Sequence, residues 1–132
     1  LESTIFLNKL AQDKVRSFVT KSTDYMVKYV MFGHPHLWPA ELGGGAPASW
    51  ALGDGAARAL GMFELLGRTE ALDEFAARVA SDLGFDVKPL AHWHATTDSR
   101  PYELSETDKL WMRTHSLADQ RLYSQSFGPN NG

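Results

Sequence analysis

The stretch that most constrains the fold is residues 61–85, GMFELLGRTEALDEFAARVASDLGF. A short apolar run, Met62–Leu66, precedes Gly67 and a polar turn. The next apolar residues recur at spacings of three and one, which places them on one stripe of an α-helix. Gly84 then stands where a left-handed helix cap is needed. The stripe comprises Leu72, Phe75, Ala76, Val79, Ala80 and Leu83. The unit is therefore predicted to be strand, turn and helix.

One predicted strand cannot form a sheet of its own. Its backbone hydrogen bonds must go to another strand, because unpaired buried N–H and C=O groups are costly. The partner strand would lie in a segment outside these residues or in a second subunit. The first residue is Leu1 and not Met, which fits a chain that has been processed or cut from a longer protein.

The remaining chain is predicted to be mainly helical. Gly33–Ser49 holds several prolines and glycines and is predicted to be a long loop. Ser105 followed by Asp108 has the spacing of a capping box, and Ser116 with Asp119 repeats it. The predicted helices are Thr4–Lys21, Thr23–Phe32 with Ser22 or Thr23 as N-cap, Trp50–Leu60, one beginning at Ser105, and a short last helix through Leu122 and Tyr123. The fold class expected is mainly α with one short strand.

The helix predicted at Thr23–Phe32 is apolar almost all round. Its apolar residues surround the axis, so it should be deeply buried or contact something outside the chain. This pattern supports a hypothesis from another functional class, in which the chain is a self-contained helical module. Such a module would dimerise through the Tyr25–Met31 face and have no catalytic role.

Length and composition suit one soluble domain. The 132 residues are 43% hydrophobic and 22% charged, and we expect a single domain at residues 1–127 with a flexible tail at 128–132. The formal charge of −3 gives no reason to expect nucleic acid as a partner. The chain has no cysteine and no apolar run long enough to cross a membrane. A soluble location, with the cytoplasm favoured, is the expectation.

Two His-x-His pairs could hold a metal ion if their segments are extended, because residues i and i+2 share a face. The pairs are His34 with His36 and His92 with His94, and a third ligand could come from Glu41, Asp98 or His115. The alternative is that all are ordinary loop histidines. That alternative is favoured because the spacing is permissive, and no metal is expected.

Other catalytic motifs are absent. The run Gly43–Gly45 and the pair around Asp54 follow no predicted strand and give no phosphate-loop pattern. No G-x-S-x-G elbow occurs, and His115 with Asp119 lacks a nucleophile. The catalytic residues are therefore unknown from the sequence.

The best anion-binding candidate is Arg100, which follows a run of hydroxyl-bearing residues that includes Thr97 and Ser99. A guanidinium and nearby hydroxyls can bind a phosphate or sulfate through charge-assisted hydrogen bonds. The alternative is an ordinary loop arginine.

Taken in order, several segments resemble the C-terminal half of the carbohydrate-type, PAPS-dependent sulfotransferase family. The matching segments are residues 24–33 (DYMVKYVMFG), 66–70 (LGRTE), 83–84 (LG), 95–101 (ATTDSRP) and 119–123 (DQRLY). Their order and spacing agree with the family over roughly residues 14–123. The family's donor-phosphate loop and its pair of 3'-phosphate-binding residues have no counterpart here, and Ala95 stands where the family has asparagine.

The resemblance implies an α/β fold with a central parallel sheet, of which this chain would be a part. It implies sulfuryl transfer from PAPS (3'-phosphoadenylyl sulfate) to a hydroxyl or amine acceptor, such as a carbohydrate or another small molecule. A loop over the donor would contain Thr97, Ser99 and Arg100. The partner would be the N-terminal half of the same fold or a second subunit, and this chain alone would be inactive.

Overall fold

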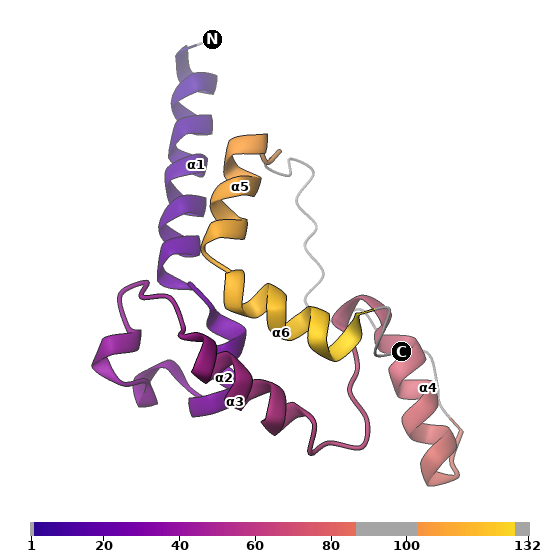
Figure 1. Ribbon diagram of the computed structural model, residues 1–132. Coiled ribbons are helices and arrows are strands. Elements are labelled where there is room, and N and C mark those ends of the chain that lie inside the picture. The colour runs from indigo at the N-terminus through magenta and orange to yellow at the C-terminus, as the bar shows by residue number, and fades with distance from the viewer. Residues whose placement is uncertain (1, 87–102, 129–132) are drawn as a thin grey trace. The chain divides into compact units, whose positions relative to one another are not determined.

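The computed structural model describes residues 2–86 and 103–128, with side chains described from Gln12 onward. These residues are mainly helical and form no strand (Figure 1). None of their helices is both long and apolar enough to cross a membrane. The α-helices are α1 (Glu2–Lys21), α2 (Tyr25–Phe32), α3 (Trp50–Leu60), α4 (Leu72–Leu83), α5 (Glu106–Thr114) and α6 (Leu117–Phe127), and the 3₁₀ helices are η1 (Pro35–Leu37), η2 (Ala40–Leu42) and η3 (Thr69–Ala71).

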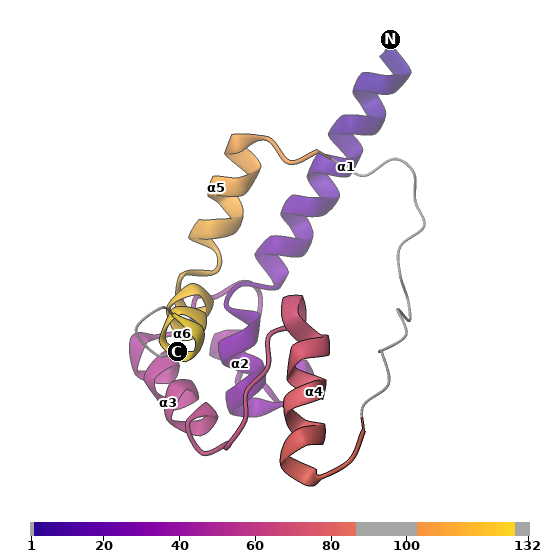
Figure 2. The ribbon, with the colours of Figure 1, turned by 90° about the vertical axis from the view of Figure 1, so that its right-hand side faces the viewer.

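The chain divides into two compact units, each described here by itself. The first contains residues 1–62 and 102–132, and the second contains residues 63–101. In the first unit, α1 lies against α5, while α2, α3 and α6 pack together (Figures 1 and 2). The core of this unit is small and consists of Val27, Ala56, Ala118 and Leu122.

Helix α3 has the predicted bounds. Ser49 is its N-cap and accepts a hydrogen bond from the Leu52 backbone N–H at 3.1 Å. Gly55 allows it to lie close to α2, because a Cβ built on Gly55 would lie 3.0 Å from the Cε atom of Met31. A glycine that weakens the isolated helix here permits the close packing of two helices.

The predicted loop between α2 and α3 contains η1, η2 and a glycine turn. Gly45 has φ of +89°, and a Cβ at this position would contact the carbonyl oxygen of Thr20. This turn therefore requires glycine, both for its backbone conformation and for its close approach to the end of α1.

The predicted strand at Met62–Leu66 is wrong, because the segment is irregular. No second strand is present among the described residues to share ladder hydrogen bonds with it, and a lone strand is not stable in water. The side chains of Met62 and Phe63 are 86% and 64% exposed. A short apolar run fits a buried strand only where a sheet is available to cover it.

The predicted amphipathic helix is present as α4 and ends as expected. Gly84 has φ of +77°, and the Phe85 backbone N–H donates to the Ala80 carbonyl at 3.0 Å, which satisfies the end of the helix. Before the helix, Gly67 lies so close to the ring of Phe75 that any Cβ would overlap it. Among the described residues of this unit only Ala80 is buried. The apolar stripe of α4 is therefore only partly covered, and Leu72 and Leu83 on it are exposed.

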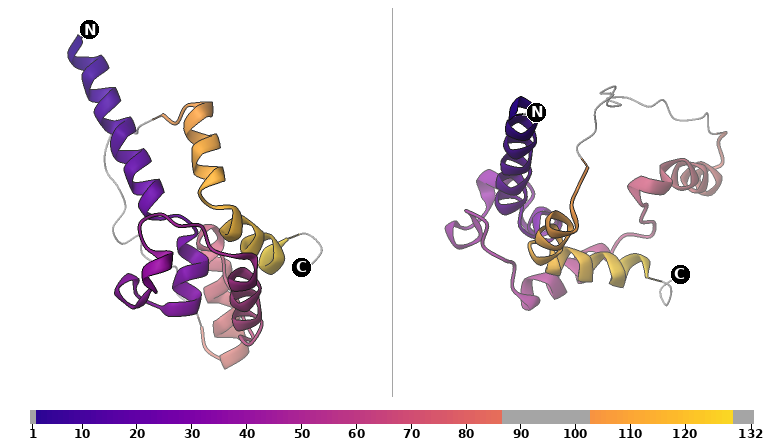
Figure 3. Two further views of the ribbon diagram at one scale, coloured as in Figure 1. Left: turned by 60° about the vertical axis from the view of Figure 1, so that its left-hand side comes forward. Right: turned by 90° about the horizontal axis from the view of Figure 1, so that it is seen from above.

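The last two helices follow the predicted pattern, and α6 is longer than expected. Ser105 and Asp108 form the predicted capping box, with both hydrogen bonds present. Helix α5 leads through a short turn into α6, and α1 runs alongside α5 (Figure 3). The side chain of Leu122 on α6 is 1% exposed and completes the core.

Candidate functional site

The residues predicted to cover a donor nucleotide are Thr97, Ser99 and Arg100, and all three lie outside the described residues. His92, His94 and Asp98 do so as well. The predicted donor loop and the pair of His92 and His94 therefore stay predictions.

The other His-x-His pair is on the surface. The rings of His34 and His36 stack, with centroids 5.6 Å apart and planes 13° apart. His115 does not join them, since its Nδ1 is 2.9 Å from the Trp111 carbonyl in its own helix. Among the described residues no three His, Cys, Asp or Glu side chains are grouped to hold a metal ion.

A buried carboxylate on Asp24 is the first element of a polar junction between α2 and α6. Asp24 is 2% exposed and has a left-handed backbone with φ of 48°. Its Oδ1 accepts hydrogen bonds from the backbone N–H groups of Ala118 at 2.9 Å and Asp119 at 3.3 Å, and its Oδ2 accepts one from Ala48 at 2.9 Å. The carboxylate at the start of α2 thus satisfies the N-terminus of α6.

Asp119 of α6 caps α2 in the same way. Its Oδ2 accepts a hydrogen bond from the Met26 backbone N–H at 3.0 Å, and its Oδ1 accepts one from Val27 at 2.8 Å. These two N–H groups belong to the first turn of α2 and have no partner within the helix. Each helix therefore supplies the carboxylate that caps the other, which we term the reciprocal cap.

Lys28 is buried beside the reciprocal cap. Its side chain is 0% exposed, its ammonium donates to the Ala46 carbonyl at 2.6 Å, and it lies 5.4 Å from the ring centroid of Trp38. Burial lowers the pKa of Lys28 below its ordinary value, while the charges of Asp24 and Asp119 oppose that change. The lysine supplies positive charge beside the buried carboxylate of Asp24 and the half-buried carboxylate of Asp119.

Burial has the opposite effect on the carboxyl group of Asp119. Loss of water raises its pKa above the ordinary value, and the nearby charge of Asp24 adds to the increase. The two backbone N–H groups of α2 and the charge of Lys28 act against it. Asp119 is thus easier to protonate in the folded chain than in an unfolded one.

The reciprocal cap corrects two sequence predictions. Neither Ser22 nor Thr23 caps α2, because Asp24 occupies the N-cap position and the Thr23 hydroxyl donates to the Thr20 carbonyl at 2.8 Å. The second predicted capping box is also not formed. The Ser116 hydroxyl donates to the Met112 carbonyl at 2.7 Å, and the carboxylate of Asp119 turns to α2.

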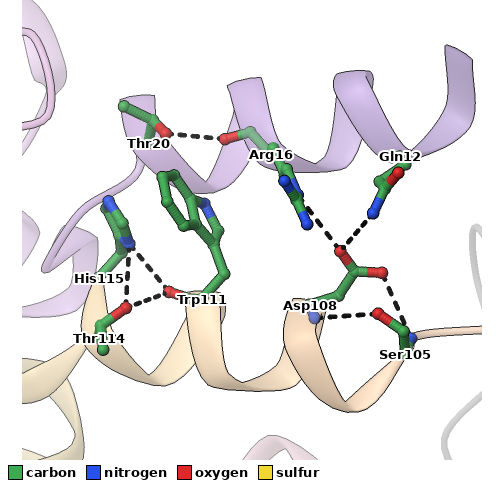
Figure 4. Close-up of polar contacts among 8 residues, drawn as sticks. All are labelled: Gln12, Arg16, Thr20, Ser105, Asp108, Trp111, Thr114 and His115. Carbon is green, nitrogen blue, oxygen red and sulfur yellow. Dashed lines mark hydrogen bonds and ion pairs between the residues drawn. The ribbon is translucent and has the colours of Figure 1, made fainter. Parts of the chain in front are cut away.

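Asp108 is a second buried carboxylate, located between α1 and α5 (Figure 4). It is 1% exposed and accepts hydrogen bonds at 3.4 Å from Gln12 Nε2 and Arg16 Nε of α1. Its other oxygen accepts from the Ser105 backbone N–H at 3.3 Å, which closes the capping box of its own helix. Asp108 therefore fixes the start of α5 and binds α1 at the same time.

An aromatic pair continues the contact between α1 and α5. The guanidinium of Arg16 lies 5.8 Å from the ring centroid of Trp111, and the ring of His115 lies 4.2 Å from the same indole. The indole N–H of Trp111 is buried without a hydrogen-bond partner. Figure 4 shows Trp111 near the end of α5 and His115 just after it, both toward α1.

A series of aromatic rings lies on α2 and the following loop, and the sequence did not predict it as a continuous feature. Trp38 meets Tyr25 edge-on at 5.3 Å, Tyr25 stacks on Tyr29 at 6.0 Å, and Tyr29 meets His34 edge-on at 6.2 Å. His34 then stacks on His36. We term these five residues the ring face. The apolar circumference of α2 was the signal that could have revealed it.

The carboxylates of Asp24, Asp108 and Asp119 all accept hydrogen bonds from backbone N–H groups, so they hold helices together. Four of the ring-face residues are exposed, in contrast, while Trp38 is half-buried and its indole N–H is buried without a hydrogen-bond partner. Comparison with protein-family models, curated proteins and solved structures gives no match to this chain.

Proposed function

We propose that this chain is the C-terminal, helical part of a sulfotransferase-like protein that transfers a sulfuryl group from PAPS to a hydroxyl or amine acceptor. The observation that supports it best is the reciprocal cap. The segments that resemble the family at residues 24–33 and 119–123 are far apart in the chain, yet Asp24 and Asp119 bind each other's helices. Residues that are coupled in this way belong to one structural unit.

The exposed segment before α4 also supports the proposal. Met62 and Phe63 are large apolar side chains in contact with water, and Leu72 and Leu83 of α4 are 49% and 68% exposed. Exposed apolar side chains of this size are suited to contact with a further part of the protein, which in the proposed enzyme is the N-terminal half of the fold or a second subunit.

In the proposed reaction, the acceptor oxygen or nitrogen attacks sulfur while the bond from sulfur to the phosphate oxygen of PAPS breaks. Adenosine 3',5'-bisphosphate is the leaving group, and the acceptor proton passes to a base that we do not assign. The roles given to Thr97, Ser99 and Arg100 are hydrogen bonds and charge pairing to the phosphates of the donor. The other donor-binding residues would lie outside this chain, so we expect this chain by itself to bind the donor nucleotide only weakly.

The test is nucleotide binding measured by thermal denaturation. Adenosine 3',5'-bisphosphate at about ten times its Kd should raise the Tm by about 5 °C, because a ligand that binds only the folded state stabilises it. Adenosine 5'-monophosphate, which lacks the 3'-phosphate, should have a smaller effect. Arg100→Ala should abolish the rise, and the matched change Arg78→Ala on the exposed side of α4 should keep it.

The proposal is wrong if the bisphosphate has no effect at millimolar concentration. It is also wrong if Arg100→Ala keeps the full rise in Tm, as Arg78→Ala is expected to do, since the binding would then involve another region.

A second candidate function is a helical interaction module without catalysis. The observation that favours it is the contrast between a small core and an exposed ring face within the first unit. A unit whose buried apolar residues are this few gains stability when a partner covers its open surface. Absence of any nucleotide effect together with self-association of the chain would favour this second candidate.

A further inference from the structure

We infer that the ring face is a two-fold interface between two copies of this chain. The inference goes beyond sulfuryl transfer and does not depend on it. The surface consists of Trp38, Tyr25, Tyr29, His34 and His36, with Met26 beside them on α2. Tyr25, Met26 and Tyr29 are 41%, 42% and 48% exposed, so they are accessible to a second molecule.

The structure divides α2 into a covered side and an open side. Val27 and Lys28 are buried, and Met31 contacts the position of Gly55 on α3. Tyr25, Met26 and Tyr29 point elsewhere and keep about half of their surface in water. Only this open side is available to a partner, which narrows the sequence prediction of a contact over the whole of Tyr25–Met31.

The charge of the surface favours a second copy over a charged partner. The one formally charged side chain of α2 and η1 is Lys28, and it is buried against Ala46 and Trp38. The carboxylate of Asp119 beside Met26 is bound to the first N–H groups of α2. The face therefore presents no lysine or arginine to pair with nucleic acid, an acidic peptide or anionic lipid. Two copies of a neutral face meet without like-charge repulsion, which a symmetric dimer must avoid.

The order of the rings suits a two-fold axis. Tyr25 and Tyr29 stand in the middle of the series, with Trp38 beyond one and His34 and His36 beyond the other. An axis through the tyrosine pair would set Tyr25 of one copy against Tyr29 of the next, and Trp38 against the histidines. In a two-fold interface every contact occurs twice. A favourable contact between Tyr25 of one copy and Tyr29 of the other would therefore be made on both sides of the axis.

The area available sets the expected strength. Aromatic and other large side chains present about 150–250 Å² each, so this face exposes on the order of 500 Å² per copy and about 1,000 Å² in total. That total is at the lower limit for specific interfaces. The dimer should therefore be reversible, with a Kd in the micromolar range or weaker.

The test is the mass of the chain in solution as a function of concentration, measured by analytical ultracentrifugation. The unmodified chain should change from monomer to dimer as its concentration rises from about 1 μM to about 1 mM. Tyr29→Arg places two like charges at the axis and should weaken the dimer at least tenfold. Ala77→Arg adds the same charge on the exposed side of α4 and should leave the association unchanged.

A second measurement uses the absence of native cysteine. Met26→Cys should form a disulfide-linked dimer under mild oxidation, much faster than Ala77→Cys, because its thiol lies beside the axis. Equal rates for the two variants would overturn the inference, as would a monomer at every concentration. A monomer whose Tm falls with Tyr29→Arg would show that the chain covers this face itself, and this too would overturn it.

Discussion

Two helix junctions of the first unit use the same residue type in different ways. At the junction of α1 and α5, Asp108 caps its own helix and reaches Gln12 and Arg16 through hydrogen bonds of 3.4 Å. At the junction of α2 and α6, Asp24 and Asp119 cap each other's helices through bonds of 2.8–3.3 Å. The first arrangement stabilises a helix that could begin alone. The second makes the start of each helix depend on the other.

The largest expected effect is the loss of Asp24. Asp24→Ala removes the acceptor for Ala48, Ala118 and Asp119 and places alanine in a left-handed conformation, so the free energy of unfolding should fall by about 3–5 kcal/mol. Asp24→Asn keeps an acceptor oxygen and tolerates φ of 48°, so the free energy of unfolding should fall by less in this variant. Urea denaturation followed by circular dichroism measures both.

Asp108→Ala is the matched change at the other junction. It should cost less than Asp24→Ala, because it removes one cap and two long hydrogen bonds. Equal losses at the two junctions would contradict the contrast drawn between them.

An intermediate effect should appear in the dependence of stability on pH. The pKa of Asp119 is raised in the folded chain above 3.8, so the folded state binds a proton more readily than the unfolded state. The stability that this proton provides is complete below pH 3.8 and is lost as the pH rises through the raised pKa. Over that interval the free energy of unfolding of the unmodified chain should decline relative to that of Asp119→Asn.

The pH experiment compares urea denaturation of the two proteins at closely spaced pH values. Asp119→Asn is the suitable reference because its side chain does not titrate and still offers one acceptor oxygen. If the difference in the free energy of unfolding between the two proteins is constant across the acidic range, the pKa of Asp119 is not raised by burial in the folded chain.

The smallest effect separates the capping box that forms from the one that does not. Ser105→Ala should lower the free energy of unfolding by about 1 kcal/mol, because its hydroxyl accepts from the Asp108 backbone N–H at 3.1 Å. Ser116→Ala should cost about 0.5 kcal/mol or less, since its hydroxyl serves Met112 and Gln120 on the surface. A larger loss for Ser116→Ala than for Ser105→Ala, in urea denaturation, would reverse the assignment.

The same contrast between local and distant partners explains which parts of the fold could be predicted from the sequence. Local patterns predicted α3, α4 with its cap at Gly84, and the box of Ser105 and Asp108, because the partners lie within a few residues. Ser116 and Asp119 have the same spacing as that box, yet Asp119 binds Met26 and Val27 of a distant helix. Nothing in the local sequence distinguishes the two cases, since the difference arises from which helix is near.

The strand prediction failed for a related reason. Met62–Leu66 has a length and composition that suit a buried strand, but a strand is defined by its neighbours and none is present among the described residues. The ring face was predictable only in part. The apolar circumference of α2 indicated an unusual helix, while the contributions of His34, His36 and Trp38 depend on how the loop returns to it.

The reciprocal cap also has a consequence for the order of events during synthesis. Asp24 leaves the ribosome early, but two of the backbone N–H groups that it binds, those of Ala118 and Asp119, are made more than ninety residues later. The carboxylate of Asp119, which accepts from the N–H groups in the first turn of α2, is also absent until then. A nascent chain stopped anywhere before Asp119 should therefore hold α2 only loosely and be an early target for proteases.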